Sequence, residues 1–287
     1  MGRSRARLVV VVKAYPQPSR KYSESVCVAG IRTDTRTPQW CRLYPVVFRD
    51  MPPDKQFEKW TEIELDVSPS SDSRPESLKA DVSSIEKVRR LSSRSNWADR
   101  LDLVRPLVVG SMCDVLVRQK ASGISLAAFR PHQVLNVVLK PEAPEWDARD
   151  WNVLSQLNLL AQDKPILEKI PWRWLYQYSC GDSCGGHTQT IIDWEIGAAW
   201  RKWRRKLGSR GAAEAVRERW LSTLCGSDRD PIFLVGNQIR RPSGFMVLGV
   251  VWPKRSPDVP HRQLRLDLAS HSGDDLSVAP GLGMLDA

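Results

Sequence analysis

Two cysteines and a histidine, Cys180, Cys184 and His187, stand within eight residues in a glycine-rich segment. Thiolate sulfur and imidazole nitrogen are ligands that tetrahedral zinc prefers, and three or four of them must converge at about 2.3 Å from the ion. The spacing therefore predicts a structural zinc knuckle. Cys225, Asp182 or a cysteine of the N-terminal half would supply the fourth ligand. Two buried thiols beside a capping histidine are the alternative.

The same segment permits a catalytic interpretation, because His187 is followed closely by Asp193 and Glu195. An open zinc site with a nearby carboxylate activates water for hydrolysis or deamination. However, the chain contains neither the paired His-x-Glu and Pro-Cys-x2-Cys motifs of deaminases nor the His-Glu-x2-His motif of metalloproteases. Acidic residues near a helix start also complement the helix dipole. A metal-dependent nuclease or deaminase-like enzyme acting on nucleic acid is thus the second hypothesis.

A basic segment follows the knuckle. Between Arg201 and Arg219 the chain has eight basic and two acidic residues, a net charge of +6 out of +10 for the whole chain. On a helical projection several of these cations lie opposite Trp200 and Trp203, while Trp194 falls among them. Such a face can bind phosphates and stack a base, and a solvated helix is the alternative. The candidate nucleic-acid-binding residues are Trp194, Arg201, Lys202, Arg204, Arg205 and Arg210.

The composition favours the same class of partner. The 287 residues include 43 Lys and Arg against 33 Asp and Glu, and 30 of the cations are Arg, whose planar guanidinium grips phosphate and stacks on flat rings. No apolar run approaches the roughly 20 residues of a membrane span. The basic start lacks a signal-peptide pattern, and the six scattered cysteines indicate reduced thiols, so we expect a cytoplasmic protein. P-loop, dinucleotide-binding and hydrolase-elbow motifs are absent.

The first half of the chain is typical of β-structure. Short Val-, Ile-, Trp- and Tyr-rich segments are separated by turns, and residues 61–67 alternate polar and apolar side chains, which indicates an antiparallel strand with one buried face. We expect residues 1–146 to form one barrel- or sandwich-like domain with an insertion at 68–103, a loop followed by a helix from residue 85. The expected strands are 8–15, 25–31, 40–47, 61–67, 113–119, 125–129 and 134–139.

The second half differs. We expect residues 147–253 to form a mixed α+β domain that contains the knuckle and a basic helix pair, and residues 254–287 to be a largely disordered tail. The expected elements of this domain are helices at 151–163, 190–207 and 212–224 and strands at 172–180, 231–236 and 245–252.

The helix at 190–207 has the clearest period in the chain. Trp200, Trp203 and Leu207 belong to an apolar stripe that spans about 100° of a helical projection. Gly208 separates this helix from the next one. We therefore expect Trp200, Trp203 and also Trp220 of the second helix to lie in the core.

The chain contains the motifs Lys13-x-Tyr15-Pro16, Arg42-Leu43-Tyr44-Pro45 and Cys180-x3-Cys184-x2-His187, the last followed by Asp193-Trp194-Glu195. Together they resemble a group of uncharacterised bacterial proteins. The resemblance covers the chain from Val9 to Pro253. It implies one fold across both halves, and it implies no activity and no catalytic residues.

The sequence thus predicts a cytoplasmic α+β protein that binds DNA, with RNA as a second nucleic-acid partner. A structural zinc knuckle would position the basic helix pair, and an altered or unpaired base is one of the ligands open to it.

Overall fold

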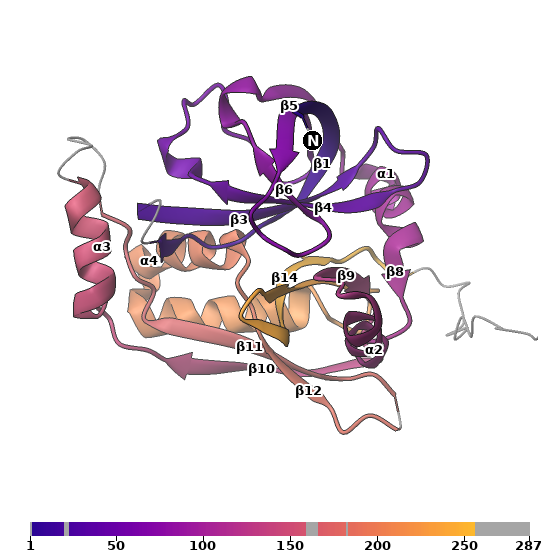
Figure 1. Cartoon of the computed structure of the whole chain (residues 1–287). Helices are drawn as coiled ribbons and strands as arrows, with labels where there is room; N and C mark the ends of the chain where they lie inside the picture. Colours follow the sequence, from indigo (N-terminus) through magenta and orange to yellow (C-terminus); the bar gives the residue numbers. More distant parts are fainter. Residues whose placement is uncertain (1, 20–22, 159–165, 182, 256–287) are drawn as a thin grey trace, which may run out of the picture.

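The structure contains two barrels of β-strands that pack side by side, with helices around the second one (Figure 1). It is a computed structural model and describes residues 2–19, 23–158, 166–181 and 183–255. Strands and helices both contribute, so the predicted α+β class is confirmed. None of the helices in these ranges has the length and apolar character needed to cross a membrane.

The first barrel is built from β1 (Ser4–Lys13), β3 (Ser23–Arg32), β4 (Gln39–Val46), β5 (Thr61–Pro69) and β6 (Ser77–Ala80). Their order is β1-β3-β4-β6-β5, and β5 pairs back to β1, so the barrel is closed. All neighbours are antiparallel except β4 and β6, which run parallel. This five-stranded Greek-key barrel has the topology of the OB fold.

Strand alternation decides which side chains fill the first barrel. Leu8 and Val10 of β1 point inward with Ile63 of β5, and all three are buried. Val9 and Val11, between and after them, belong to a different apolar cluster and are buried too. β1 is therefore covered on both faces, which accounts for its uninterrupted Leu-Val-Val-Val-Val run.

The sequence predicts a loop and a helix for the insertion at 68–103, and the structure corrects this. β6 lies inside the predicted loop, where Leu78 packs against the barrel interior. β7 (Glu86–Arg90) pairs with β5 at the start of the predicted helix, and the helix α1 (Arg94–Val104) begins later. Neither strand has a recognisable sequence pattern, because β6 is short and β7 is exposed along its whole length and so lacks a buried apolar face. The minor elements of this half are β2 (Gln17–Ser19), η1 (Phe48–Asp50), η2 (Val82–Ser84) and η3 (Arg105–Leu107).

The second barrel is built from β9 (Leu126–Phe129), β10 (Gln133–Pro141), β11 (Trp172–Ser179), β12 (His187–Thr190), β13 (Ile232–Gln238) and β14 (Arg241–Val251). β9 and β10 follow each other in the chain like one bent strand, since β9 pairs with β13 and β10 pairs with β11. β12 follows β11, and β14 follows β13. A parallel bridge between Ile191 and Val247 connects β12 to β14.

The second barrel therefore repeats the strand order of the first, including one parallel contact between its third and fifth strands. The chain segments between the third and fourth strands also correspond, although α4 (Trp194–Glu218) occupies this place in the second barrel and only η1 does in the first. The structure is thus two OB-like barrels, and the second is the more open one because a single bridge joins its two sheets.

The two halves divide near residue 107, whereas the sequence analysis placed the boundary at residue 146. Residues 113–119, predicted as a strand, belong to the helix α2 (Met112–Ser122). Ser111 caps this helix through its hydroxyl, and Gly123 ends it at a φ of 72°. The valines of the segment favour a strand on propensity alone, but the two caps outweigh them. The short β8 (Val108–Val109) pairs in parallel with β9 and also belongs to the second half.

The predicted basic helix pair is present. α4 consists of two helical segments that lie side by side (Figure 1) and join at Gly208, whose φ of 68° and ψ of 172° break the helix. The π-helical turn η4 (Arg219–Thr223) ends it. Trp200 and Trp220 are buried as predicted, whereas Leu207 is 53% exposed because it lies at the turn, beyond the core.

The remaining helix, α3 (Ala148–Asn158), confirms the first part of the helix predicted at 151–163. Residues 159–163 lie outside the described residues, and so does the predicted tail from residue 256 onward.

A third apolar cluster joins the two barrels. It combines outward-facing side chains of the first barrel with outward-facing side chains of the second. Burying each large aliphatic side chain contributes about 1.5–3 kcal/mol, so the two barrels form one unit. The members from the first barrel include Val9, Val11, Ala29 and Ile31, and those from the second include Leu126, Ala128, Ile232, Leu234 and Leu248.

An ion pair is buried at the same junction. The Lys59 Nζ of the first half lies 2.8 Å from Asp193 Oδ2 and 3.4 Å from Glu195 Oε1, at the start of α4. Ala14 forms an antiparallel β-bridge with Asp193, and the Tyr15 N–H donates to the Ile192 carbonyl over 2.8 Å. The start of α4 is therefore held by the first barrel.

We expect Asp193→Asn to lower the free energy of unfolding by about 3–5 kcal/mol, because it leaves the Lys59 ammonium buried without a full counter-charge. Glu195→Gln is the matched control. Glu195 touches the same ammonium but is 58% exposed, and its loss should cost less than about 1 kcal/mol. Urea unfolding of the two variants provides the comparison, and equal stabilities would contradict the role given to this pair.

Candidate metal centre and basic surface

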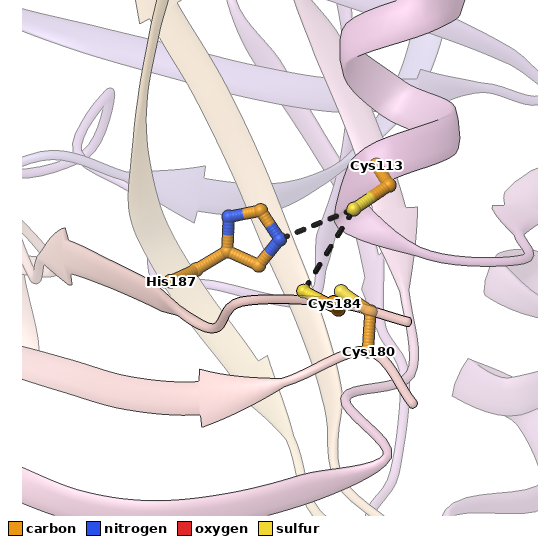
Figure 2. Close-up of side chains that lie close together, drawn as sticks. All are labelled: Cys113, Cys180, Cys184 and His187. Carbon is orange, nitrogen blue, oxygen red and sulfur yellow. Dashed lines mark hydrogen bonds between the residues drawn. The ribbon is translucent and has the colours of Figure 1, made fainter. Parts of the chain in front are cut away.

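Four potential metal ligands meet beside the second barrel. One ligand atom from each of Cys113, Cys180, Cys184 and His187 lies within 4.8 Å of all the others (Figure 2). Cys113 stands in the first turn of α2, and Cys180 directly follows β11. Cys184 lies in the turn between β11 and β12, and His187 begins β12. The group therefore links a helix to the turn of a β-hairpin.

The distances fit a tetrahedral ion. Sulfurs about 2.3 Å from one zinc lie about 3.8 Å apart, and a sulfur and a nitrogen lie about 3.5 Å apart. The Sγ atoms of Cys113 and Cys184 are separated by 3.8 Å. Cys113 Sγ and His187 Nε2 are separated by 3.4 Å. Three sulfurs and one nitrogen at these spacings can hold one metal ion.

The environment of the thiols is not uniform. Burial raises the pKa of Cys180 to about 12, although backbone hydrogen bonds from Met112 and Cys113 at the start of α2 act in the other direction. Hydrogen bonds from the backbone of Cys180 and Gly186 lower the pKa of Cys184 instead. Burial also lowers the pKa of His187, which favours the neutral imidazole that a metal requires.

The ring of Tyr178 fixes the orientation of the His187 imidazole. The two rings stack, with the centroids 5.3 Å apart. The Tyr178 hydroxyl donates to Gln189 Oε1 over 2.6 Å, and both residues are buried. This packing fixes the plane of the imidazole and leaves Nε2 facing Cys113.

The three residues predicted from the sequence are therefore brought together, and they are joined by Cys113, a cysteine of the predicted first domain that lies in the second half of the structure. Cys225 does not join them, because its thiol donates to the Tyr176 hydroxyl over 3.6 Å. Asp182 lies outside the described residues. The sequence contained a signal for Cys113, since Ser111 with Asp114 indicates a helix start that would place the thiol in the first turn. Assigning residues 113–119 to a strand concealed it.

The structure places Asp193 and Glu195 elsewhere. Asp193 is buried against Lys59, and its carboxylate accepts from the Glu195 N–H as the N-cap of α4. Neither residue belongs to the Cys/His group found among the described residues. The pair therefore has the structural role of a helix cap and an ion pair.

Trp194 lies against the first barrel and not among the cations of α4. Its ring centroid is 5.6 Å from that of Phe48 and 6.4 Å from that of Tyr15. The Lys13 ammonium lies 4.3 Å from the Trp194 ring and 3.7 Å from the Phe48 ring. Burial lowers the pKa of Lys13 to about 8. Trp194 is thus a packing contact between the two halves.

The cations of α4 fall into two groups. Arg201 and Arg204 form ion pairs with Glu168, and Arg201 also donates to the Tyr15 hydroxyl. Arg217 pairs with Glu214, and the remaining four are exposed and have no ion-pair partner among the residues that the structure describes. They are Lys202, Arg205, Lys206 and Arg210.

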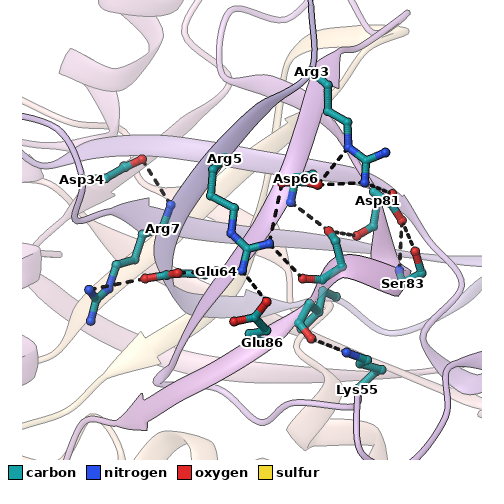
Figure 3. Close-up of polar contacts among 12 residues, drawn as sticks. Arg3, Arg5, Arg7, Asp34, Lys55, Glu64, Asp66, Asp81, Ser83 and Glu86 are labelled. Atoms are coloured by element: carbon teal, nitrogen blue, oxygen red, sulfur yellow. Dashed lines mark hydrogen bonds and ion pairs between the residues drawn. The ribbon is translucent and has the colours of Figure 1, made fainter.

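The arginines at the start of the chain are neutralised. Arg3, directly before β1, lies with Arg5 and Arg7 of β1 beside acidic residues of β5 and β7 (Figure 3). Arg3 pairs with Asp66 over 2.8 Å, and Arg5 pairs with Glu86 over 2.8 Å. Each of these exposed ion pairs contributes little to stability, and together they leave little positive charge for a partner.

Comparisons with known proteins match both halves. Residues 108–269 match the family described as "Domain of unknown function (DUF8757)", and residues 4–106 match "Domain of unknown function (DUF8758)". The two ranges meet where the two barrels divide. No curated protein matches the chain.

One solved structure that matches is described as "Structure of murine DNA binding protein bound with ds DNA". It covers 90% of this chain and 99% of that chain at 9% sequence identity, with a TM-score of 0.30. A TM-score of this size does not define a common fold, so this likeness supports no function for the chain.

We expect Cys113→Ser to reduce the bound metal of the purified chain as strongly as Cys184→Ser does, because each removes one of four ligands. Cys225→Ser is the control, since its hydroxyl can replace the thiol beside Tyr176 and should leave the metal content unchanged. Elemental analysis of the three variants is the measurement. Full metal content in Cys113→Ser would remove this residue from the ligand set.

Proposed function

The chain belongs to the family described as Domain of unknown function (DUF8757), a description that assigns no activity, and we propose that it is a nucleic-acid-binding protein with a structural zinc site. The observation that supports binding is the distribution of positive charge. The cations of β1 are paired with acids, whereas those on the outer side of α4 are exposed and unpaired among the described residues. The surplus charge of the chain is therefore concentrated on one helix pair.

The geometry of this surface suits a phosphate chain. Lys202, Arg205 and Lys206 stand at positions i, i+3 and i+4 and therefore share one helix face. Arg210 follows just after the turn at Gly208. Each cation that contacts a phosphate releases counterions, which makes such binding strong at low salt and weak at high salt. DNA is the first partner that we propose, and RNA, which has the same phosphate chain, is the second.

Zinc is the metal that suits the Cys/His group. Three thiolates and one imidazole form a closed set of soft and borderline ligands, and structural zinc sites use this Cys3His combination. A full set of four protein ligands leaves no position for a water or a substrate. The ion would tie α2 to the turn between β11 and β12, which has few apolar side chains of its own. The proposed site is therefore structural.

The second hypothesis is a metal-dependent enzyme with His187, Asp193 and Glu195, and no contact among the described residues favours it. His187 lies with the cysteines, while Asp193 is bound to Lys59 and caps a helix. A buried carboxylate in an ion pair is not free to activate water.

We expect the triple variant Lys202→Ala, Arg205→Ala and Lys206→Ala to weaken DNA binding and to flatten its dependence on salt. The slope of log K against log salt should decrease in magnitude by about 0.7–0.9 for each lost phosphate contact. Fluorescence anisotropy titrations at several salt concentrations measure this slope.

The matched control removes three cations that are already paired, Arg3, Arg5 and Arg89. It lowers the net charge by the same amount and should leave the slope unchanged. Equal slopes for the two triple variants would show that only net charge matters, and salt-independent or absent binding in the unaltered chain would contradict the proposed function.

Removal of the metal gives a separate test of the site's role. We expect a zinc chelator to lower the melting temperature of the chain, because binding to the folded state alone contributes directly to stability. Adding back zinc should restore the original temperature. A melting temperature that does not respond to chelation would contradict a structural role, and chelator-sensitive turnover of DNA or RNA would favour the enzyme hypothesis.

A further inference from the structure

The second and third strands of the first barrel have different surroundings from the second and third strands of the second barrel. In the OB fold, the outer face of the second and third strands is the surface that takes oligonucleotides or oligosaccharides. In the first barrel these strands are β3 and β4, and the second half of the chain covers them. Ala29 and Ile31 are 0% exposed and pack with side chains of β9, β13 and β14. Arg42 is 2% exposed and donates to the Ser125 carbonyl over 2.9 Å.

The equivalent face of the second barrel belongs to β11 and β12, with β10 beside them. Figure 1 shows these strands on the side of the molecule away from the first barrel. The strand register separates inward from outward residues, because Tyr176 and Tyr178 point into the core and their neighbours point out. The outward residues include no Asp or Glu. They are Asn136, Val138, Lys140, Arg173, Leu175, Gln177, Thr188 and Thr190, of which Leu175 is buried at 8% exposure.

The turn of α4 lies at one end of this sheet. Lys140 and Arg173 are direct neighbours across β10 and β11, and Arg173 also pairs with Glu142. Trp172, the residue before Arg173, lies on the same side of β11 as Trp174 and Tyr176 and donates its indole N–H to Ser209 Oγ over 2.9 Å. Ser209 lies in the turn of α4, beside Arg210. The outer face therefore carries Lys140 and Arg173 at the end of β11 that adjoins the turn of α4.

We propose that this outer face of the second barrel, with Lys140 and Arg173 at one end, is a docking surface for single-stranded nucleic acid, and that the first barrel serves as a scaffold. The inference rests on the proposed function and names its substrate class. Cations at one end match the phosphate chain, and the amide and hydroxyl side chains of Gln177 and Thr188 can reach the edges of unpaired bases. A duplex hides those edges in its grooves, so it can use the cations but not the sheet.

The test compares a labelled short oligothymidine with a hairpin duplex of similar charge, using the full chain and anisotropy at one fixed salt concentration. We expect the single strand to bind roughly tenfold more tightly than the duplex. The double variant Lys140→Glu and Thr188→Glu should weaken single-strand binding by about tenfold or more, because both positions are exposed and would repel phosphates. Lys79→Glu, an exposed position on the first barrel, is the control and should have no effect.

A variant that binds more tightly serves as a second test, because misfolding would not increase the affinity. Thr188→Lys should tighten single-strand binding and steepen its salt slope by about 0.7. Equal affinities for the two ligands, or unchanged binding in both the Thr188→Lys and the double variant, would overturn the inference while leaving the proposed function in place if the α4 triple variant still weakens binding. Absence of salt-dependent binding to either ligand would overturn both.

Discussion

The burial of β1 on both of its faces is the constraint on which the rest of the structure depends. Leu8 and Val10 fill the first barrel, while Val9 and Val11 contact the second. A strand of this kind cannot be left at a surface without exposing a row of valines. The first barrel is therefore complete only when the second covers it, and the buried Lys59–Asp193 pair adds a geometric requirement to that contact. Breaking such a pair costs far more than forming it gains, so it specifies the relative placement of the barrels.

The Cys/His group concerns a different local problem, which is how the turn between β11 and β12 is held in place. The turn between β11 and β12 has only glycine and polar residues between its cysteines and its histidine, so it has little to bury. Apolar packing cannot fix such a turn, whereas four ligand atoms converging from three points of the chain can. Cys113 lies in the first turn of α2 and brings that helix into the group (Figure 2). Packing of His187 on Tyr178 connects the group to the core of the second barrel.

Local patterns in the sequence predicted local features well. Most of the barrel strands, the break at Gly208 and the convergence of Cys180, Cys184 and His187 were predicted, since each depends on residues close in the chain, whereas the barrel strands β6 and β12 were not. The failures share a cause, which is that the deciding contact is distant. Residues 113–119 have the propensity of a strand, and two helix caps with a core on one side make them a helix. A helical projection places Trp194 on the basic side of the helix. It contains no information on the first half of the chain, whose Phe48 and Lys13 pack against the Trp194 ring. The strand order and the parallel contacts depend on pairing across the chain, on which periodicity has no bearing.

The net charge of +10 indicates a binding surface only when the cations in ion pairs are distinguished from the unpaired ones. An arginine on β1 and an arginine on α4 contribute equally to the total, yet Arg5 faces an acidic strand whereas Arg205 faces solvent. An ion pair on a barrel wall contributes little to stability, and it also removes that cation from the field that a polyanion would meet. Because Arg201 and Arg204 share the carboxylate of Glu168, the unpaired cations of α4 lie along one helix face. Under the proposed function, the unpaired cations on one helix face would contact a phosphate chain, and they belong to the second barrel and not to the first despite the common topology of the two.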